Sequence, residues 1–132
     1  MKEIHWLREQ GIKLDFFAFH AHRPFGLWAD FKVLYKVLDI FEEEGLRIHI
    51  SEFGMHEALN IVGDVRASQW NAELQAQYYE MIFSAMFSHP AVDVINMWGM
   101  SANTWMAGSG LLDKDGKAKP SFYILRDLIH KK

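Results

Sequence analysis

The sequence contains no cysteine, and this absence excludes both a disulfide framework and a thiolate metal site. It has no apolar run that approaches 18 residues, so we expect no membrane-spanning segment. Like charges do not cluster, and the formal net charge of −3 argues against a basic surface for nucleic acid. The N-terminus lacks the apolar core of a signal peptide, so secretion of the natural protein would need a signal upstream of this sequence.

What the sequence does contain is enough apolar side chain to build a packed core. Half of its 132 residues are hydrophobic, and five of them are tryptophan. This length predicts one domain or a piece of one, and no linker or low-complexity segment divides it. We therefore treat residues 1–132 as a single partial domain.

Apolar periodicity and helix-breaking residues divide the chain into one helix followed by three strand–helix units. Residues 31–44 carry apolar side chains at spacings of three and four, which predicts an amphipathic helix that ends at Gly45. A longer helix is predicted to follow Ser68 as its N-cap and to end at Pro90. The remaining predicted elements are a helix at 3–10, strands at 14–22, 46–53 and 93–98, and a last helix that starts at Pro120.

Strands that are apolar on both faces and alternate with helices predict a parallel sheet covered by helices. A doubly wound sheet and part of an eight-stranded barrel both fit this order. Three strands alone leave two unpaired edges, which indicates a portion of a larger sheet. We therefore expect either self-association or a complementing N-terminal half of the barrel.

Polar and aromatic side chains stand at the carboxyl ends of the predicted strands, where parallel α/β folds place their functional sites. The first strand ends with His20 and His22, the second with Glu52, and the third with Trp98. These side chains come from adjacent strands, so we expect them to converge on one small volume.

Side-chain alternation predicts which of these residues face the same way. His20 and His22 are two positions apart and should share one face of the sheet. The same rule predicts that Glu52 lies on the face that carries Ile48 and Ile50.

A carboxylate beside an aromatic platform suits glycoside hydrolysis. Retaining glycosidases use one carboxylate as the nucleophile and a second carboxylic acid, about 5–5.5 Å away, to shuttle a proton. Tryptophan faces stack on the apolar faces of sugar rings. His22 is predicted to donate a hydrogen bond to Glu52, which would keep the carboxylate ionised and oriented.

Several short segments together resemble glycoside hydrolase family 10, the xylanase family, in order and spacing over essentially the whole chain. Ile-His-Ile-Ser-Glu-Phe-Gly resembles the nucleophile strand of that family, and Phe-His-Ala-His resembles the strand before it. Met-Trp-Gly and a later Trp resemble its Trp-Gly…Ser-Trp segment, and two C-terminal segments resemble its tail. The matching segments are 19–22, 48–54, 97–99 with Trp105, 110–113 and 119–122.

This resemblance implies an α/β fold in which the chain supplies strands six to eight of a parallel (β/α)8 TIM barrel. It implies an endo-1,4-β-xylanase-like enzyme that cleaves xylan or xylo-oligosaccharides with retention. Glu52 would be the nucleophile, His22 would orient it, and His20, Trp98 and Trp105 would bind substrate. The acid/base Glu would lie on the fourth strand, outside this chain. The resemblance implies no cofactor and no metal, and a full-length protein that is secreted.

The sequence departs from the family pattern at three places. His20 replaces a usual glutamine, Gly54 stands where an aspartate is commoner, and the loop after Trp98 lacks the usual aspartate. Together with the missing acid/base residue, these departures favour a second interpretation, a carbohydrate-binding remnant that holds a sugar chain without cleaving it.

Two further alternatives remain open from the sequence. One is another barrel glycosidase of the cellulase or mannanase type, because its nucleophile also lies at a strand end. The other is a metal site formed by His20, His22, Glu52 and His56, because the His-x-His spacing puts two imidazoles on one face.

Overall fold

The computed structural model of the chain describes residues 1–22, 31–55, 71–104 and 108–131. It confirms the predicted order of one helix and three strand–helix units. The elements are α1 (Lys2–Glu9), β1 (Phe16–His22), α2 (Phe31–Glu43), β2 (Arg47–Gly54), α3 (Ala72–Ser88), β3 (Val92–Met97) and α4 (Pro120–His130).

Helix α3 begins later than the sequence predicts. Its N-cap is Asn71, whose side-chain oxygen accepts a hydrogen bond from the backbone N–H of Leu74 at 2.9 Å. The predicted cap, Ser68, precedes this start and lies outside the described residues. That prediction was wrong because asparagine caps a helix as well as serine does, and Asn71 lies closer to the first helical residue.

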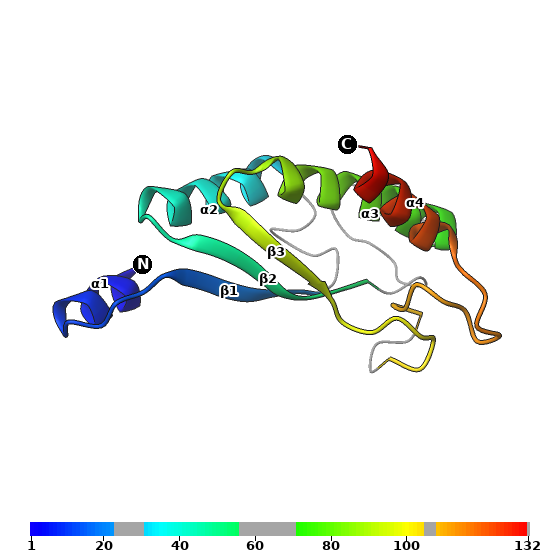
Figure 1. The fold of residues 1–132 in the computed structure, drawn as a ribbon, viewed down its shortest axis with the longest axis horizontal. Coiled ribbons are helices and arrows are strands. Elements are labelled where there is room, and N and C mark those ends of the chain that lie inside the picture. The colour runs from blue at the N-terminus through cyan, green and yellow to red at the C-terminus, as the bar shows by residue number, and fades with distance from the viewer. Residues whose placement is uncertain (23–30, 56–70, 105–107, 132) are drawn as a thin grey trace.

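The three strands form a parallel sheet in the order β1-β2-β3. Helices α2, α3 and α4 lie along one face of this sheet, and α1 lies at the end of the sheet (Figure 1). In the part of the chain that the structure describes, no helix is long and apolar enough to cross a membrane.

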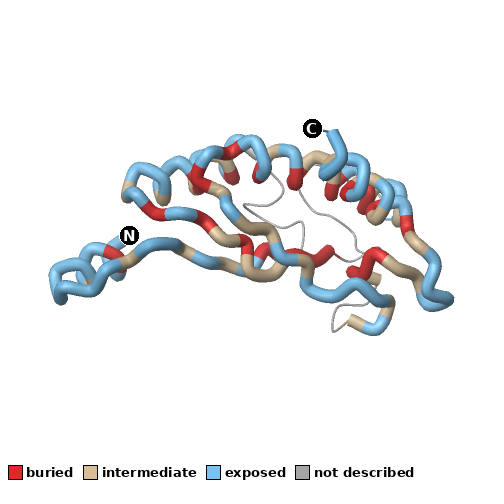
Figure 2. The backbone as a smooth tube through the Cα atoms, in the orientation of Figure 1, coloured by how far each residue is buried: buried red, intermediate tan, exposed pale blue. Residues whose placement is uncertain are grey.

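The core lies between the sheet and the helix layer, where buried stretches of strand and helix face each other (Figure 2). Phe53 on β2 is fully buried and meets the edges of Tyr79 and Phe83 on α3, with ring centroids 5.0 and 4.9 Å apart. Ile48 and Ile50 on the same strand are also fully buried. Each such side chain contributes about 1.5–3 kcal/mol by leaving water, so β2 is held mainly through its helix-facing side chains.

A change of register in β2 corrects one prediction about the site. Phe19 on β1 pairs with Ile50, whereas the next residue, His20, pairs with Glu52, so Ser51 is the extra residue of a bulge. The bulge puts Phe53 in the core beside Ile50 and turns Glu52 away from it. The prediction that Glu52 shares a face with the core isoleucines was wrong, because simple alternation does not continue through a bulge.

We call the sheet face opposite the helix layer the open face. Phe16 stacks on the ring of His49 there, with centroids 4.4 Å apart, and 54% of Phe16 is exposed. His20 lies further along β1 and is also exposed. An apolar ring with this exposure belongs on a face that a further layer of side chains normally fills, as in the interior of a closed barrel.

Candidate active site

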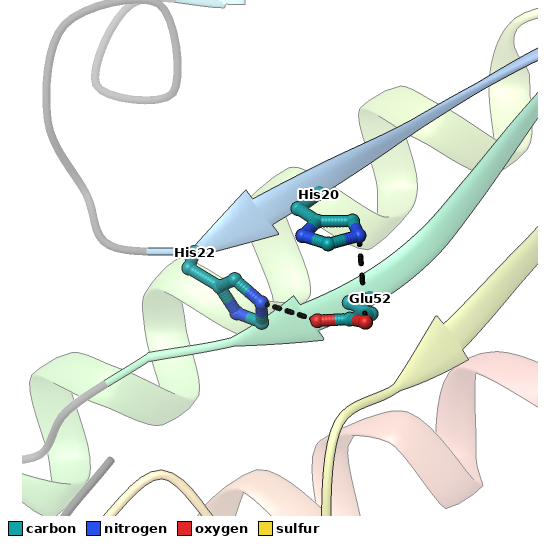
Figure 3. Close-up of side chains that lie close together, drawn as sticks. All are labelled: His20, His22 and Glu52. Atoms are coloured by element: carbon teal, nitrogen blue, oxygen red, sulfur yellow. Dashed lines mark hydrogen bonds and ion pairs between the residues drawn. The ribbon is translucent and has the colours of Figure 1, made fainter. Parts of the chain in front are cut away.

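The carboxylate of Glu52 is the centre of a compact cluster at the carboxyl ends of β1 and β2. Each of its two oxygens faces the imidazole of a different histidine of β1 (Figure 3). His22 Nε2 donates a hydrogen bond to Oε2 at 2.9 Å, and His20 Nε2 lies 3.4 Å from Oε1. The structure therefore brings together the three residues that the sequence placed at these strand ends.

The three side chains differ in how firmly they are held. The side chains of His22 and Glu52 are 13% and 20% exposed, whereas that of His20 is 62% exposed. The ring of His22 is covered from the β2 side by the backbone of Gly54, where a Cβ atom would lie 3.4 Å from Nδ1. Glu52 is thus anchored by a part-buried imidazole and is bordered by a second imidazole that faces solvent.

The bulge that orients Glu52 is itself fastened to β1. The hydroxyl of Ser51 donates a hydrogen bond to the backbone carbonyl of Phe19 at 3.2 Å. The sequence analysis missed this residue and the bulge. A signal was present, because the apolar residues of the strand change spacing from two (Ile48 to Ile50) to three (Ile50 to Phe53).

Trp98 directly follows β3 and stands beside the end of β2. Its backbone N–H donates to the carbonyl of Phe53 at 2.8 Å, and 45% of the residue is exposed. Its backbone carbonyl lies 3.8 Å from the position of a Cβ atom at Gly54. The tryptophan therefore borders the strand end that carries Glu52. Trp105 and His56, which the sequence analysis also named, lie outside the described residues.

Helix α3 supports the loops that follow β2 and β3. The buried amide of Gln75 donates to the carbonyls of Met55 and Gly108, and the phenol of Tyr79 donates to the carbonyl of Ser109 at 3.2 Å. Burial raises the pKa of the Tyr79 phenol far above its usual range, so it remains a neutral donor. The sequence analysis missed both residues because a polar side chain on an apolar helix face has no partner visible in the sequence.

The cluster of Glu52, His20 and His22 contains one carboxylate among the described residues. An ionised carboxylate with one oriented oxygen can act as a nucleophile, as a base or as a ligand for a cation. A retaining glycosidase needs a second carboxyl group about 5–5.5 Å away. In the described part of the chain this cluster offers one carboxylate, so such a pair would need a second carboxyl group from elsewhere.

Among the described residues, two groups of side chains have the chemistry of metal ligands and lie close enough together to share an ion. In the first, ligand atoms of His20, His22 and Glu52 all lie within 4.8 Å of one another, and the same holds for Asp39, Glu42 and His89 in the second. The first group occupies the carboxyl ends of the strands, whereas the second joins α2 to the end of α3.

Comparison with known proteins shows where this chain belongs. Its sequence matches the family model described as "Glycosyl hydrolase family 10" over residues 1–128. It is 30% identical to endo-1,4-beta-xylanase B of Cellvibrio japonicus over 115 residues, and this aligned stretch covers 86% of this chain and 17% of that protein. It is also 31% identical to the anti-sigma-I factor RsgI6 of Acetivibrio thermocellus over 96 residues, and this aligned stretch covers 73% of this chain and 11% of that protein.

Solved structures of similar fold include two xylanases. Native xylanase10C from Cellvibrio japonicus superposes with a TM-score of 0.78 at 16% identity, over 99% of this chain and 32% of that one. The intracellular xylanase of Thermoanaerobacterium saccharolyticum, in complex with xylotriose, gives a TM-score of 0.69 at 18% identity, over 94% of this chain and 37% of that one. At these identities the likeness establishes the fold, which is a portion of a parallel (β/α)8 barrel and not a doubly wound sheet.

The predicted family is therefore confirmed, and the cellulase-type alternative drops out. The chain spans less than one-fifth of its relative xylanase B and about a third of the chains of the two xylanase structures. This chain belongs to glycosyl hydrolase family 10.

Proposed function

We propose that this chain supplies the nucleophile half of a retaining β-1,4-xylanase active site. The observation that carries the proposal is the placement of Glu52. Its carboxylate projects from the end of a parallel strand on the open face, with one oxygen bonded to His22 and the other beside His20. The family assignment and the xylanase names of its relatives support xylan, or an oligosaccharide of it, as the substrate.

In the proposed reaction an oxygen of Glu52 attacks the anomeric carbon, and the bond to the leaving sugar breaks. A carboxylic acid protonates the leaving oxygen, and a glycosyl ester on Glu52 results. The same acid residue, now a carboxylate, then takes a proton from water, which attacks the anomeric carbon and releases Glu52. The hydrogen bond from His22 Nε2 holds Oε2 of Glu52 in position before the attack.

The acid/base residue belongs, in this proposal, to a barrel strand outside this chain. We propose that residues 1–132 are a single partial domain, whose open face and two outer strand edges the remaining strands of the barrel would cover. Those strands would come from the same longer polypeptide or from a complementing N-terminal half. The native mass of the 132-residue chain tests the need for completion, since an isolated, stable monomer of 15.4 kDa would contradict it.

Substrate contacts in the proposal come from His20, Trp98 and Trp105. The exposed imidazole of His20 can donate a hydrogen bond to a sugar hydroxyl, and the partly exposed indole of Trp98 offers a face for stacking. Trp105 takes its role from the family pattern alone, since it lies outside the described residues.

Because the proposed polymer is found outside cells, we further propose that the full-length protein is secreted. Detection of the protein in the culture medium would support secretion, whereas recovery from the cell lysate alone would contradict it.

The decisive experiment is to trap the covalent intermediate on the full-length protein. A 2-fluoro xylobioside with a good leaving group should form a long-lived ester, because the fluorine slows its hydrolysis more than its formation. Peptide mapping by mass spectrometry should find the added sugar on Glu52, and Glu52→Gln should abolish the labelling. A sugar on another carboxylate would overturn the assignment of the nucleophile.

A second candidate function is carbohydrate binding without cleavage. It is favoured by the single carboxylate of the cluster and by the fact that one relative is named as an anti-sigma factor and not as an enzyme. A titration of the full-length protein with xylotriose, followed by tryptophan fluorescence, separates the two. Saturable binding with no product after prolonged incubation supports the binding role, whereas release of xylose or xylobiose supports the enzyme.

A further inference from the structure

The cluster at the strand ends holds a second imidazole, that of His20, which takes no part in the bond-breaking step beyond its proposed contact with substrate. His22 already binds and orients Glu52 through Oε2. His20 adds a second imidazole nitrogen 3.4 Å from Oε1, and ligand atoms of all three residues lie within 4.8 Å of one another. We propose that His20, His22 and Glu52 bind a divalent transition-metal ion, and that Zn²⁺ suits this set of two imidazoles and one carboxylate.

The ligand atoms are close enough to bind one ion after the side chains adjust. Zn–N and Zn–O bonds are about 2.0–2.2 Å long, so two ligand atoms of a tetrahedral ion lie roughly 3.3–3.5 Å apart. The 3.4 Å contact of His20 Nε2 is with Oε1 of Glu52, whereas the 2.9 Å contact of His22 Nε2 is with Oε2, so the carboxylate must also turn for one of its oxygens to bind the same ion as both imidazoles. The two histidine rings, whose centroids are 5.7 Å apart, are the pair that must approach.

The side chain that must move is the one with freedom to do so. His20 is 62% exposed, whereas His22 and Glu52 are 13% and 20% exposed. A metal ion would therefore meet two part-buried ligands and recruit the third from solvent. Two neutral imidazoles and one carboxylate leave a net charge of +1 and a fourth position open to water, a ligand composition that proteins use for zinc.

The ion and the orienting hydrogen bond exclude each other. His22 binds Glu52 through Nε2, and the same nitrogen must offer its lone pair to a metal. On metal binding the imidazole proton moves to Nδ1, and the carboxylate of Glu52 becomes a ligand instead of a free nucleophile. The bound ion thus acts as an inhibitor of any attack by Glu52 on a sugar.

The second histidine–carboxylate group is a poorer site for the same ion. His89 Nδ1 accepts a hydrogen bond from the backbone N–H of Ala91 at 3.2 Å, so in the neutral ring Nε2 carries the proton and donates it to Asp39. A metal at Nε2 would require the loss of that proton or of the bond to Ala91. The side chain of His89 is also fully buried, so its ring cannot turn to improve the geometry.

Isothermal titration of the full-length protein with ZnCl₂, in the absence of any sugar, tests the proposal. We expect one ion per chain, and replacement by Co²⁺ should give the visible absorption of a tetrahedral site. His20→Gln keeps a polar side chain at an exposed position and should weaken Zn²⁺ binding by at least about tenfold. Two controls, His130→Gln in the last turn of α4 and Asp39→Asn in the second group, should leave the affinity unchanged.

Three results would overturn the proposal: no binding by the unaltered chain, unchanged affinity in His20→Gln, or loss of binding in Asp39→Asn. Circular dichroism of each variant verifies that the fold is retained. Because the readout is metal binding and not hydrolysis, failure here is distinct from failure of the proposed function. A xylanase without a metal site would still label Glu52 with the fluoro-sugar.

Discussion

The two three-residue histidine–carboxylate groups found among the described residues contain similar side chains but are built in opposite ways. At the carboxyl ends of the strands the carboxylate of Glu52 is largely covered and one histidine, His20, is exposed. At the junction of α2 and α3 the histidine, His89, is fully buried, and the carboxylates of Asp39 and Glu42 are 51% and 44% exposed. The first group therefore presents the oriented carboxylate of Glu52 to the open face, whereas in the second group a buried imidazole holds two helices together.

The comparison shows that residue composition alone does not identify a site. His89 caps the end of α3, packs edge-on against Tyr35 at 5.0 Å, and bonds to both Ala91 and Asp39. Both ring nitrogens of His89 thus bond to residues outside α3. The imidazoles of His20 and His22 instead point at one carboxylate that no described backbone group shares.

The largest expected effect is on catalysis. Glu52→Gln in the full-length protein keeps the shape of the side chain but removes the charge needed for attack, so kcat on a xylo-oligosaccharide should fall by at least about 10³-fold. Asp39→Asn is the matched control in the second group and should retain full activity. A steady-state assay that finds the Glu52→Gln enzyme fully active would show that Glu52 is not the nucleophile, and the proposed functional difference between the two groups would be wrong.

The second effect is on stability. His89→Ala removes a fully buried ring together with its hydrogen bonds, and should lower the free energy of unfolding by about 2–3 kcal/mol. Urea unfolding of the full-length protein measures this. At temperatures where the variant is folded, its KM should match that of the unaltered protein. A shift in KM would mean that the α2–α3 junction contributes to sugar binding.

A third prediction separates the two histidines of the first group. His22→Gln loosens the nucleophile and should lower kcat by about 10–100-fold with little change in KM. His20→Ala removes an exposed hydrogen-bonding group and should raise KM by roughly 2–10-fold. A purely structural role for His22 would instead lower stability and leave kcat of the folded enzyme intact.

The smallest effect concerns a third histidine–carboxylate contact, which holds α1. Glu44 is bonded by His5 at 2.7 Å and by Arg8 at 2.6 Å, and these partners hold its pKa below the usual range for a carboxyl. Because the pKa of Glu44 is lower in the folded state than in the unfolded state, the contact stabilises the fold at pH values above the unfolded-state pKa. This stabilisation is lost as the pH falls through the folded-state pKa. We therefore expect the amide-exchange protection factors of α1, which are corrected for the intrinsic effect of pH on exchange, to fall as the Glu44 carboxyl becomes protonated. Glu44→Gln should show the same loss of protection at neutral pH.

Much of this fold follows from spacing along the chain. The apolar periods, Gly45, Pro90 and Pro120 located most helix ends and the alternation of strands with helices. The convergence of Glu52, His20 and His22 also followed, because parallel strands end at the same edge. The face on which Glu52 lies did not follow, because one extra residue in a strand reverses every later side chain.

The supports of the site were equally hidden. Gln75 and Tyr79 bond to backbone carbonyls that lie 20 to 33 positions away in the chain, and such contacts have no periodic signature. Gly110 is explained only by the structure, since a Cβ atom there would lie 1.9 Å from the carbonyl oxygen of Ser101. Sequence patterns locate elements, whereas tertiary neighbours decide which loop conformation is possible.

The bulge at Ser51 also bears on how such a site can arise or disappear over evolution. Ser51 is the residue that the strand pairing leaves out, so its deletion would give a regular strand in which Glu52 follows Ile50 directly and stays on the open face. A change that straightened the bulge but kept Ser51 would instead turn Glu52 toward the helix layer without replacing the glutamate. For descendants of this chain, the presence of the glutamate therefore has to be considered together with the state of the bulge.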